Sequence, residues 1–151
     1  MTSKYLSLAV FAVLVAIAAQ VGATFEPGGW YAALGKPAWT PPGWVFPIAW
    51  TVLYVMIALA GWYAWRAAGA GTAVTFWFAQ LVLNALWSYL MFGRHDITAA
   101  LIDIGVLWLA IVVFIVVVRR QSAVAAWLFV PYLAWVTFAA ALNFEVWRLN
   151  P

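Results

Sequence analysis

Long apolar segments alternate with short polar ones along the chain, and this pattern predicts a bundle of membrane-spanning helices. A helix needs about 20 mostly apolar residues to cross the hydrocarbon core of a bilayer. Five segments meet this condition, at about 5–25, 44–65, 73–92, 97–118 and 123–147. We therefore expect an all-α integral membrane protein in which residues 1–151 form a single transmembrane domain of five helices.

The connections between these segments differ in length and character. Three are short, namely "RAAGAG", "GRHD" and "RRQSA", so we expect successive helices to be antiparallel neighbours. The first connection, residues 26–43, is long and rich in Pro, Gly and Trp. Because proline fixes φ and lowers the entropy lost when a loop becomes ordered, this composition predicts a long ordered loop that acts as a lid.

The composition indicates which solvent surrounds the helices. The chain is 69% hydrophobic and 7% charged, whereas a soluble domain has roughly a quarter charged residues. Much of its surface therefore has to face lipid. The net charge of +3 comes from isolated residues, so we expect no nucleic-acid binding. The chain has no cysteine, which excludes disulfides, thiolate metal sites and cysteine nucleophiles.

The basic residues indicate how the helices are oriented. An odd number of spans puts the two termini on opposite sides of the membrane, and basic residues are enriched in cytoplasmic connections. Four lie on the N-terminal side and three on the other: Lys4, Arg66, Arg119 and Arg120 against Lys36, Arg94 and Arg148. This small excess predicts a cytoplasmic N-terminus. We interpret the first apolar segment as a retained span rather than a signal peptide.

Small residues follow one face of the first helix. Ala12, Ala16, Ala19 and Ala23 recur at spacings of four, three and four residues. Such a stripe allows the backbones of two membrane helices to approach closely. Packing within one chain and formation of a homodimer are both compatible with it.

Polar side chains inside the membrane gather on the third helix. Gln80, Asn84 and Ser88 recur every four residues, which places them on one helix face. Asp103 on the fourth helix is a clearly intramembrane carboxyl group with no His or Lys beside it. Polar groups are costly in lipid and usually face a protein interior or a cavity. For Asp103, a structural hydrogen bond and a role in orienting a ligand or carrying a proton both stay open.

Aromatic and polar residues are expected at similar depths beneath the long loop. A rise of 1.5 Å per residue puts Trp50 and Asp103 roughly 9 Å below that side of the membrane. Asn84, Trp87 and Trp135 follow at roughly 12, 8 and 18 Å. Trp50 and Trp135 lie too deep for an interfacial aromatic belt. A pocket between helices, with apolar walls and a few polar groups, has this composition, although ordinary helix packing also accounts for the two tryptophans.

Five segments carry a resemblance to a known family: "WYAALGKPAWTPPGWVFPIAWTVLY" (30–54), "QLVLNALW" (80–87), "FGRHDITAALID" (92–103), "PYLAW" (131–135) and "LNFEVWR" (142–148). In order and spacing they resemble the translocator protein family, whose members are also called tryptophan-rich sensory proteins or peripheral-type benzodiazepine receptors. Many members have a proline after the tryptophan at the position of Trp87. Ser88 stands there in this chain and puts in doubt the helix kink that a proline allows.

The resemblance implies a five-helix bundle, commonly a homodimer, with a pocket that the first loop closes. It implies porphyrins and drug-like hydrophobic molecules as ligands, so a porphyrin is expected as a ligand and no cofactor as obligatory. The family's pocket positions fall here on Tyr31, Pro41, Trp50, Asn84, Trp87, Trp135, Ala139 and Leu142.

The resemblance leaves several activities open. It implies a receptor that binds porphyrins and senses or transports them. In some bacterial members two tryptophans are proposed to support light-dependent porphyrin breakdown, and these correspond to Trp50 and Trp135. A sterol or porphyrin transporter is a further alternative. The family's cholesterol-recognition segment has a tyrosine where this chain has Phe144, so we do not expect specific cholesterol binding.

Metal and acid–base chemistry find little support in the sequence. Haem is usually held by His, Cys, Met or Tyr, and the sole histidine, His95, falls in a short connection at the membrane edge. A porphyrin held by stacking on Trp and Tyr is therefore favoured over ligated haem, and we expect no metal site. The sequence also has no Ser–His–Asp constellation or phosphate loop. Glu145 is expected to pair with Arg148, three residues further along its helix.

Overall fold

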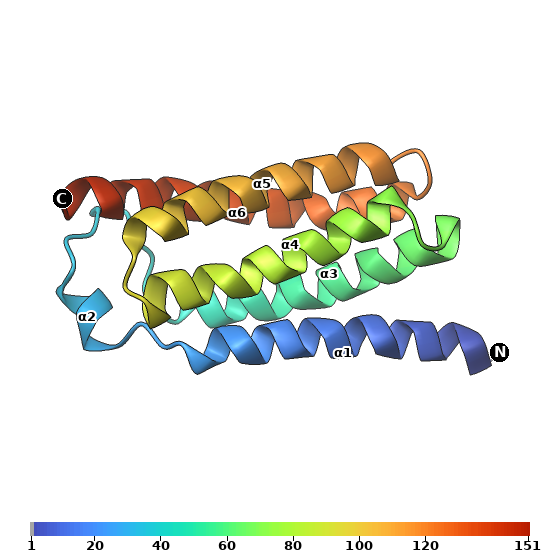
Figure 1. Cartoon of the computed structure of the whole chain (residues 1–151), viewed down its shortest axis with the longest axis horizontal. Helices are drawn as coiled ribbons and strands as arrows, with labels where there is room; N and C mark the ends of the chain where they lie inside the picture. Colours follow the sequence, from blue (N-terminus) through green and yellow to red (C-terminus); the bar gives the residue numbers. More distant parts are fainter. Residues whose placement is uncertain (1) are drawn as a thin grey trace.

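Five long helices form the protein, as the hydrophobic pattern predicts. The computed structural model describes residues 2–151, and five helices in this range are long and apolar enough to cross a membrane. Their bounds are α1 Thr2–Thr24, α3 Val45–Ala68, α4 Thr72–Ser88, α5 Ile97–Val118 and α6 Ala123–Leu149. The third span includes the helical residues that follow α4 and ends at Gly93. The two ends of the chain lie at opposite ends of the bundle (Figure 1). The predicted all-α five-helix fold is confirmed.

Local signals explain where these helices begin and end. The Asp96 carboxylate accepts a hydrogen bond of 2.8 Å from the backbone N–H of Ala99 and so caps the start of α5. At the other end of the membrane, α3 continues past its predicted end to Ala68. It ends at Gly69, whose φ of +64° suits a residue without a side chain. The Gly69 N–H donates to the carbonyl oxygen of Trp65 at 2.7 Å and closes the last turn.

The third span changes its geometry just after Ser88. There α4 passes into a π-helix, η1, at Tyr89–Gly93. The backbone N–H of Arg94 donates to the carbonyl oxygen of Tyr89 at 2.8 Å, across five residues. Single π-turns inside helices are associated with bends and with functional sites. The chain therefore departs from regular α-helix close to Ser88, the position at which many members of the family that it resembles have a proline.

The helices form a ring whose order differs from their order in the chain. α4 packs against α5, α5 against α6, α6 against α3, α3 against α1 and α1 against α4. Successive helices are therefore close neighbours for α4–α5 and α5–α6, as expected. By contrast, α3 and α4 touch only lightly although a short turn connects them.

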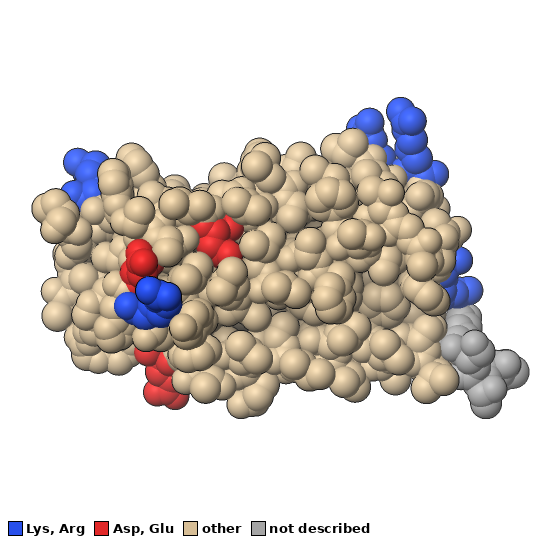
Figure 2. Space-filling view, viewed as in Figure 1, with Lys and Arg blue, Asp and Glu red and all other residues tan. Residues whose placement is uncertain are grey.

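Charged side chains lie towards the two ends of the bundle. On the face shown in Figure 2, the blue and red groups leave an uncharged band between them. Near the lid end, Arg148 donates to the Glu145 carboxylate at 2.7 Å, which confirms the pairing expected from their spacing. An uncharged band between charged ends is what a protein surrounded by the hydrocarbon core of a bilayer requires.

The first loop is ordered and lies across one end of the bundle (Figure 1). It contains a short helix, α2, at Gly28–Ala33. The Lys36 ammonium donates to the carbonyl oxygens of Tyr31 at 2.6 Å and Leu34 at 3.0 Å, and lies 4.8 Å from the centroid of the Tyr31 ring. These bonds satisfy carbonyl groups that the end of a helix leaves free. The predicted long ordered loop is confirmed, and we call residues 26–43 the lid.

The small-residue stripe of α1 faces away from the rest of the chain. Among residues 5–24 of α1, the bundle buries Phe11, Val15 and Ala18. By contrast, the stripe is mostly exposed: Ala12, Ala16 and Ala23 are exposed and Ala19 is half-buried. Packing within one chain therefore does not account for the stripe.

A buried tryptophan lies against a glycine where α1, α3 and α4 meet. The Trp77 side chain is fully buried, and its Nε1–H donates to the carbonyl oxygen of Ile57 on α3 at 2.8 Å. Its ring meets Phe11 of α1 edge-on, with centroids 4.7 Å apart. A Cβ atom added at Gly61 would lie 2.4 Å from Trp77 Cε2 and 2.7 Å from Phe11 Cδ1. Because real side chains do not approach so closely, glycine at this position allows the indole to join the helices.

Replacing Gly61 is predicted to destabilise the bundle. A methyl group at this site has to displace the buried ring, so we expect Gly61→Ala to lower the free energy of unfolding by about 1–3 kcal/mol. The measurement is the thermal unfolding midpoint of the purified protein in detergent. Gly105→Ala is the matched control, because Gly105 also lies within a helix and an added Cβ there meets no atom within 4 Å. Equal losses in the two variants would contradict the packing explanation.

Candidate functional site

Two of the predicted site tryptophans meet between α3 and α6. The Trp50 and Trp135 rings lie 6.5 Å apart between centroids and are nearly perpendicular, at 87°. Trp50 also contacts the ring of Tyr132 at 6.2 Å, and Phe46 contacts Trp135 at 5.8 Å. Such edge-to-face arrangements are the ones that aromatic rings favour. The sequence-based expectation that Trp50 and Trp135 share one space is consistent with this geometry.

A chain of hydrogen bonds runs beside these rings and joins α3, α4 and α6. The Tyr54 hydroxyl donates to Asn84 Oδ1 at 2.9 Å, and Asn84 Nδ2 donates to the Tyr132 hydroxyl oxygen at 3.0 Å. The Tyr132 hydroxyl donates in turn to Gln80 Oε1 at 2.8 Å, and Gln80 Nε2 donates to the carbonyl oxygen of Trp77 at 2.8 Å. We call Tyr54, Asn84, Tyr132 and Gln80 the polar chain.

The polar stripe on α4 supplies the residues of the polar chain that the sequence reveals. Gln80 and Asn84, four residues apart, are both buried. Ser88 continues the stripe towards α1, because a Cβ added at Gly22 would lie 3.4 Å from its Oγ atom. Tyr54 and Tyr132 were not predicted as site residues. Their positions offered a signal, since each lies three or four residues from a site tryptophan on its own helix.

Other predicted residues form a second group nearer the lid. Trp87 Nε1–H donates to Asn143 Oδ1 at 2.9 Å, and the Trp87 ring contacts Phe92 at 5.4 Å. The Tyr31 ring meets the same Phe92 edge-on, also at 5.4 Å. Leu142 is buried in this group. Trp87 packs against both this group and the main core, so it joins the lid to the space around Trp50.

The lid contributes rings of its own. Trp30 stacks on His95 with centroids 4.2 Å apart and 11° between the planes, so the histidine lies against the lid rather than in the bundle interior. Trp39 contacts Phe138 of α6 at 5.7 Å. Pro41 is half-buried in the lid, and Ala139 is half-buried at the edge of the main core.

The Tyr31 hydroxyl keeps its proton under the lid. Burial raises the pKa of the Tyr31 phenol above its ordinary value of 10.0, because removal from water disfavours the phenolate. The group therefore remains a neutral hydrogen-bond donor at physiological pH. It adds a polar atom to the lid side of the site without adding charge.

Two buried polar atoms have no hydrogen-bond partner within the part of the chain that the structure describes. They are Asp103 Oδ2 and Trp135 Nε1. The structural hydrogen bond considered for Asp103 is therefore not made by this oxygen. Unpaired polar atoms are costly inside a membrane protein, and such atoms call for a specific explanation. The free indole N–H of Trp135 offers one directional hydrogen bond to a guest molecule beside the rings.

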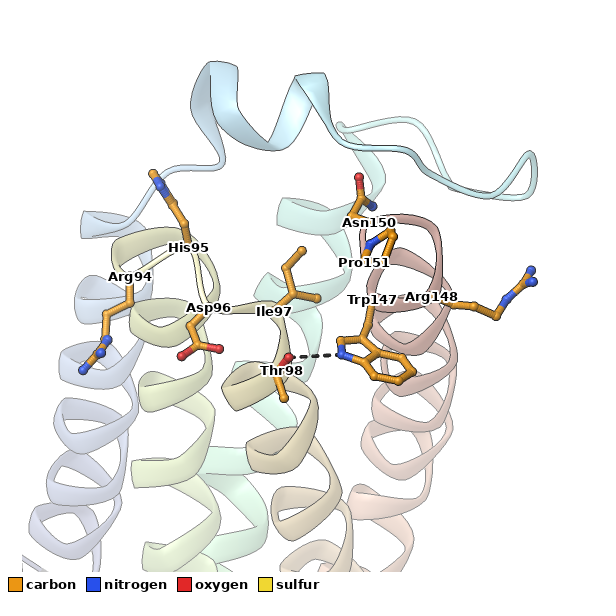
Figure 3. Close-up of a pocket in the computed structure, with 9 residues that line it drawn as sticks. All are labelled: Arg94, His95, Asp96, Ile97, Thr98, Trp147, Arg148, Asn150 and Pro151. Atoms are coloured by element: carbon orange, nitrogen blue, oxygen red, sulfur yellow. Dashed lines mark hydrogen bonds between the residues drawn. The ribbon is translucent and has the colours of Figure 1, made fainter.

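Hollows on the surface lie apart from the Trp50–Trp135 pair. One, of about 760 Å³, lies between the start of α5 and the end of α6, and Figure 3 shows it beneath the lid ribbon. Its wall includes Thr98 and Trp147, which share a hydrogen bond of 3.1 Å. The rings of Trp50, Tyr132 and Trp135 instead contact one another. A planar guest that enters between Trp50 and Trp135 has to separate these rings.

Metal-ligating side chains do not gather at the site. Among residues 2–151, no three His, Cys, Asp or Glu side chains come close enough to hold one ion. The candidate site consists of aromatic rings together with neutral hydroxyl and amide groups.

Comparisons with known proteins relate the whole chain to one family. Residues 8–148 match the model of the TspO/MBR family. The chain is 40% identical over 150 residues to Protein CrtK of Rhodobacter capsulatus, covering 95% of this chain and 92% of that one. It is 40% identical over 158 residues to the tryptophan-rich protein TspO of Chlorobaculum tepidum, over the full length of both. It is 34% identical over 148 residues to the human translocator protein, covering 93% and 88% of the two chains.

Membership of this family supports a membrane receptor or binding role. The five apolar helices make the protein an integral, multi-pass membrane protein. The family match includes most or all of each of the five helices, and the whole lid between the first two. The chain belongs to the TspO/MBR family.

Proposed function

We propose that the protein is a membrane receptor that binds porphyrins and drug-like hydrophobic molecules beneath the lid. The observation that carries this proposal is the meeting of Trp50 and Trp135 beside an indole N–H that has no partner among residues 2–151. Flat apolar ligands match aromatic walls, and a few polar groups fix their orientation. A metal-free porphyrin held by stacking needs no axial ligand, in keeping with the position of His95 in the lid contact.

The proposed ligand lies between the lid and three helices. Its contacts are the eight residues given by the family resemblance: Tyr31, Pro41, Trp50, Asn84, Trp87, Trp135, Ala139 and Leu142. Asn84 is already engaged in the polar chain, so its role is to hold the wall of the site in place. The Trp135 indole N–H has no partner within the described residues, so it can supply the directional hydrogen bond.

Loss of the two indoles is predicted to weaken porphyrin binding. Trp50→Phe combined with Trp135→Phe removes ring area and the free N–H, so we expect the Kd for protoporphyrin to rise about tenfold or more. The measurement is a titration of tryptophan fluorescence, analysed for the midpoint rather than for the amplitude. Trp127→Phe is the control, because Trp127 lies on the same helix and is 72% exposed. An unchanged Kd in the double variant would place the ligand elsewhere.

Light-dependent porphyrin breakdown is the second candidate function, favoured by the direct contact between the two indole rings. In this proposal an excited porphyrin takes one electron from an indole and passes it to dioxygen, which becomes superoxide. The indole radical cation then oxidises the ground-state porphyrin and is itself restored. Combination of the porphyrin radical cation with superoxide adds one dioxygen to the macrocycle.

A time course of porphyrin absorbance under illumination separates breakdown from binding. We expect porphyrin to disappear several times faster with the native protein than with the Trp50→Phe, Trp135→Phe variant, both saturated with ligand. Removal of dioxygen should stop the reaction, because dioxygen is the oxidant. Equal rates in the two proteins would reduce the reaction to ordinary photobleaching.

We further propose that the N-terminus faces the cytoplasm, the side on which the sequence has the small excess of basic residues.

We also propose that a second copy of the chain covers the alanine stripe of α1. The stripe is exposed in the single chain, and small residues allow close helix approach. We expect Ala16→Phe to shift the protein from dimer to monomer, as measured by light scattering in detergent. Ile17→Phe, on another exposed face of α1, should leave the dimer intact. A dimer that persists in Ala16→Phe would exclude this interface.

A further inference from the structure

The side chain of Asn150 forms a two-bond pair with the backbone of the lid. The Gly35 N–H donates to Asn150 Oδ1 at 3.0 Å, and Asn150 Nδ2 donates to the Gly35 carbonyl oxygen at 3.0 Å. The same Nδ2 also donates to the carbonyl oxygen of Val146 at 2.7 Å, which fixes the amide to the end of α6. In Figure 3 Asn150 lies directly below the lid ribbon. One amide therefore satisfies both backbone groups of a lid residue 115 positions away.

This pair is the polar attachment between the lid and the bundle. Within the part of the chain that the structure describes, the Lys36 ammonium bonds only to lid carbonyls, so it stiffens the lid without fastening it to a membrane helix. The other attachments are ring contacts, such as Trp30 on His95 and Trp39 on Phe138. Within residues 2–151, no other hydrogen bond joins the lid to a helix that does not flank it.

The backbone around Gly35 is shaped for this contact. Leu34 is extended, with φ of −66° and ψ of 146°, so the chain leaves α2 and runs along the end of α6. A Cβ added at Gly35 would lie 3.4 Å from Leu149 Cβ and 3.6 Å from Asn150 Oδ1, which shows how closely the two segments approach. The pair is exposed to water, and water can replace both hydrogen bonds when the segments separate.

We propose that Asn150 is a positioning residue that latches the lid shut and thereby sets the rate at which ligand enters and leaves. This inference rests on the proposed binding function. Opening begins when water replaces the two bonds to Gly35, after which the ring contacts of the lid separate. Because the latch closes the same lid whether or not a ligand is bound, breaking it speeds association and dissociation together. Affinity then changes little.

The amide hydrogen of Gly35 reports the latch directly and without any ligand. It is bonded to the Asn150 side chain, whereas the Thr40 amide is bonded inside the lid to the carbonyl oxygen of Pro37 at 3.0 Å. In Asn150→Ala we expect hydrogen exchange at Gly35 to become about tenfold faster or more, with Thr40 within about twofold of the native protein. Continued protection of Gly35, or equal loosening of both amides, would overturn the latch.

Variants on the lid side separate the latch from damage to the end of α6. Gly35→Pro removes the N–H donor but leaves the Asn150–Val146 bond, and the extended Leu34 is compatible with a following proline. Gly35→Ala keeps the donor and is its matched control. We expect Gly35→Pro and Asn150→Ala each to raise the association and dissociation rates of protoporphyrin about fivefold, with Kd within about twofold. Combining them should add little, because Asn150→Ala already removes the bond that Gly35→Pro breaks.

The outcomes distinguish the latch from the proposed function. Unchanged rates in both variants, or a rise in Kd with a lower thermal midpoint, would show that Asn150 is merely structural. Effects that add fully in the combined variant would likewise exclude a shared pair. If protoporphyrin does not bind the native protein, the proposed function fails, and hydrogen exchange at Gly35 still decides whether the latch exists.

Discussion

No water is at hand inside a bilayer to satisfy a polar side chain, and the rest of this structure depends on that constraint. A buried amide or hydroxyl group has to find its partner on another helix. Gln80, Asn84, Tyr54 and Tyr132 meet the requirement together, through bonds of 2.8 to 3.0 Å that join three helices. Each tyrosine also presents a ring to Trp50. The bonds that hold the bundle together therefore also position the aromatic site.

The absence of water inside the bilayer also makes the unpaired polar groups informative. Asp103 Oδ2 and Trp135 Nε1 are buried, and neither has a partner within the described chain. In a soluble protein, water could satisfy such atoms at little cost. The Trp135 N–H lies at the cluster of rings from α3 and α6, where a guest would supply both apolar area and a hydrogen-bond acceptor. The unpaired indole N–H and the aromatic cluster therefore support the same interpretation, a place for a ligand.

Much of the fold follows from the sequence because lipid imposes a simple rule on length and polarity. That rule locates all five spans, and the four-residue spacing reveals Gln80 and Asn84. It does not reveal Tyr132, because a tyrosine in an apolar helix has the same pattern whether its hydroxyl is bonded or not. Nor does it give the order of the helices around the ring, which depends on single contacts such as Trp77 against Gly61. The Asn150–Gly35 pair joins residues far apart in the chain, and no periodicity marks it.

Two sets of hydrogen bonds of similar length therefore have different consequences. The bonds of the polar chain are 2.8 to 3.0 Å long and lie inside the bundle, where breaking one leaves a polar atom in an apolar medium. The bonds of Asn150 to Gly35 are 3.0 Å long and exposed, where water replaces what is lost. We therefore expect the interior network to stay formed while the attachment of the lid breaks and forms again. A binding protein in a membrane needs both properties, since its site has to stay assembled while its entrance opens.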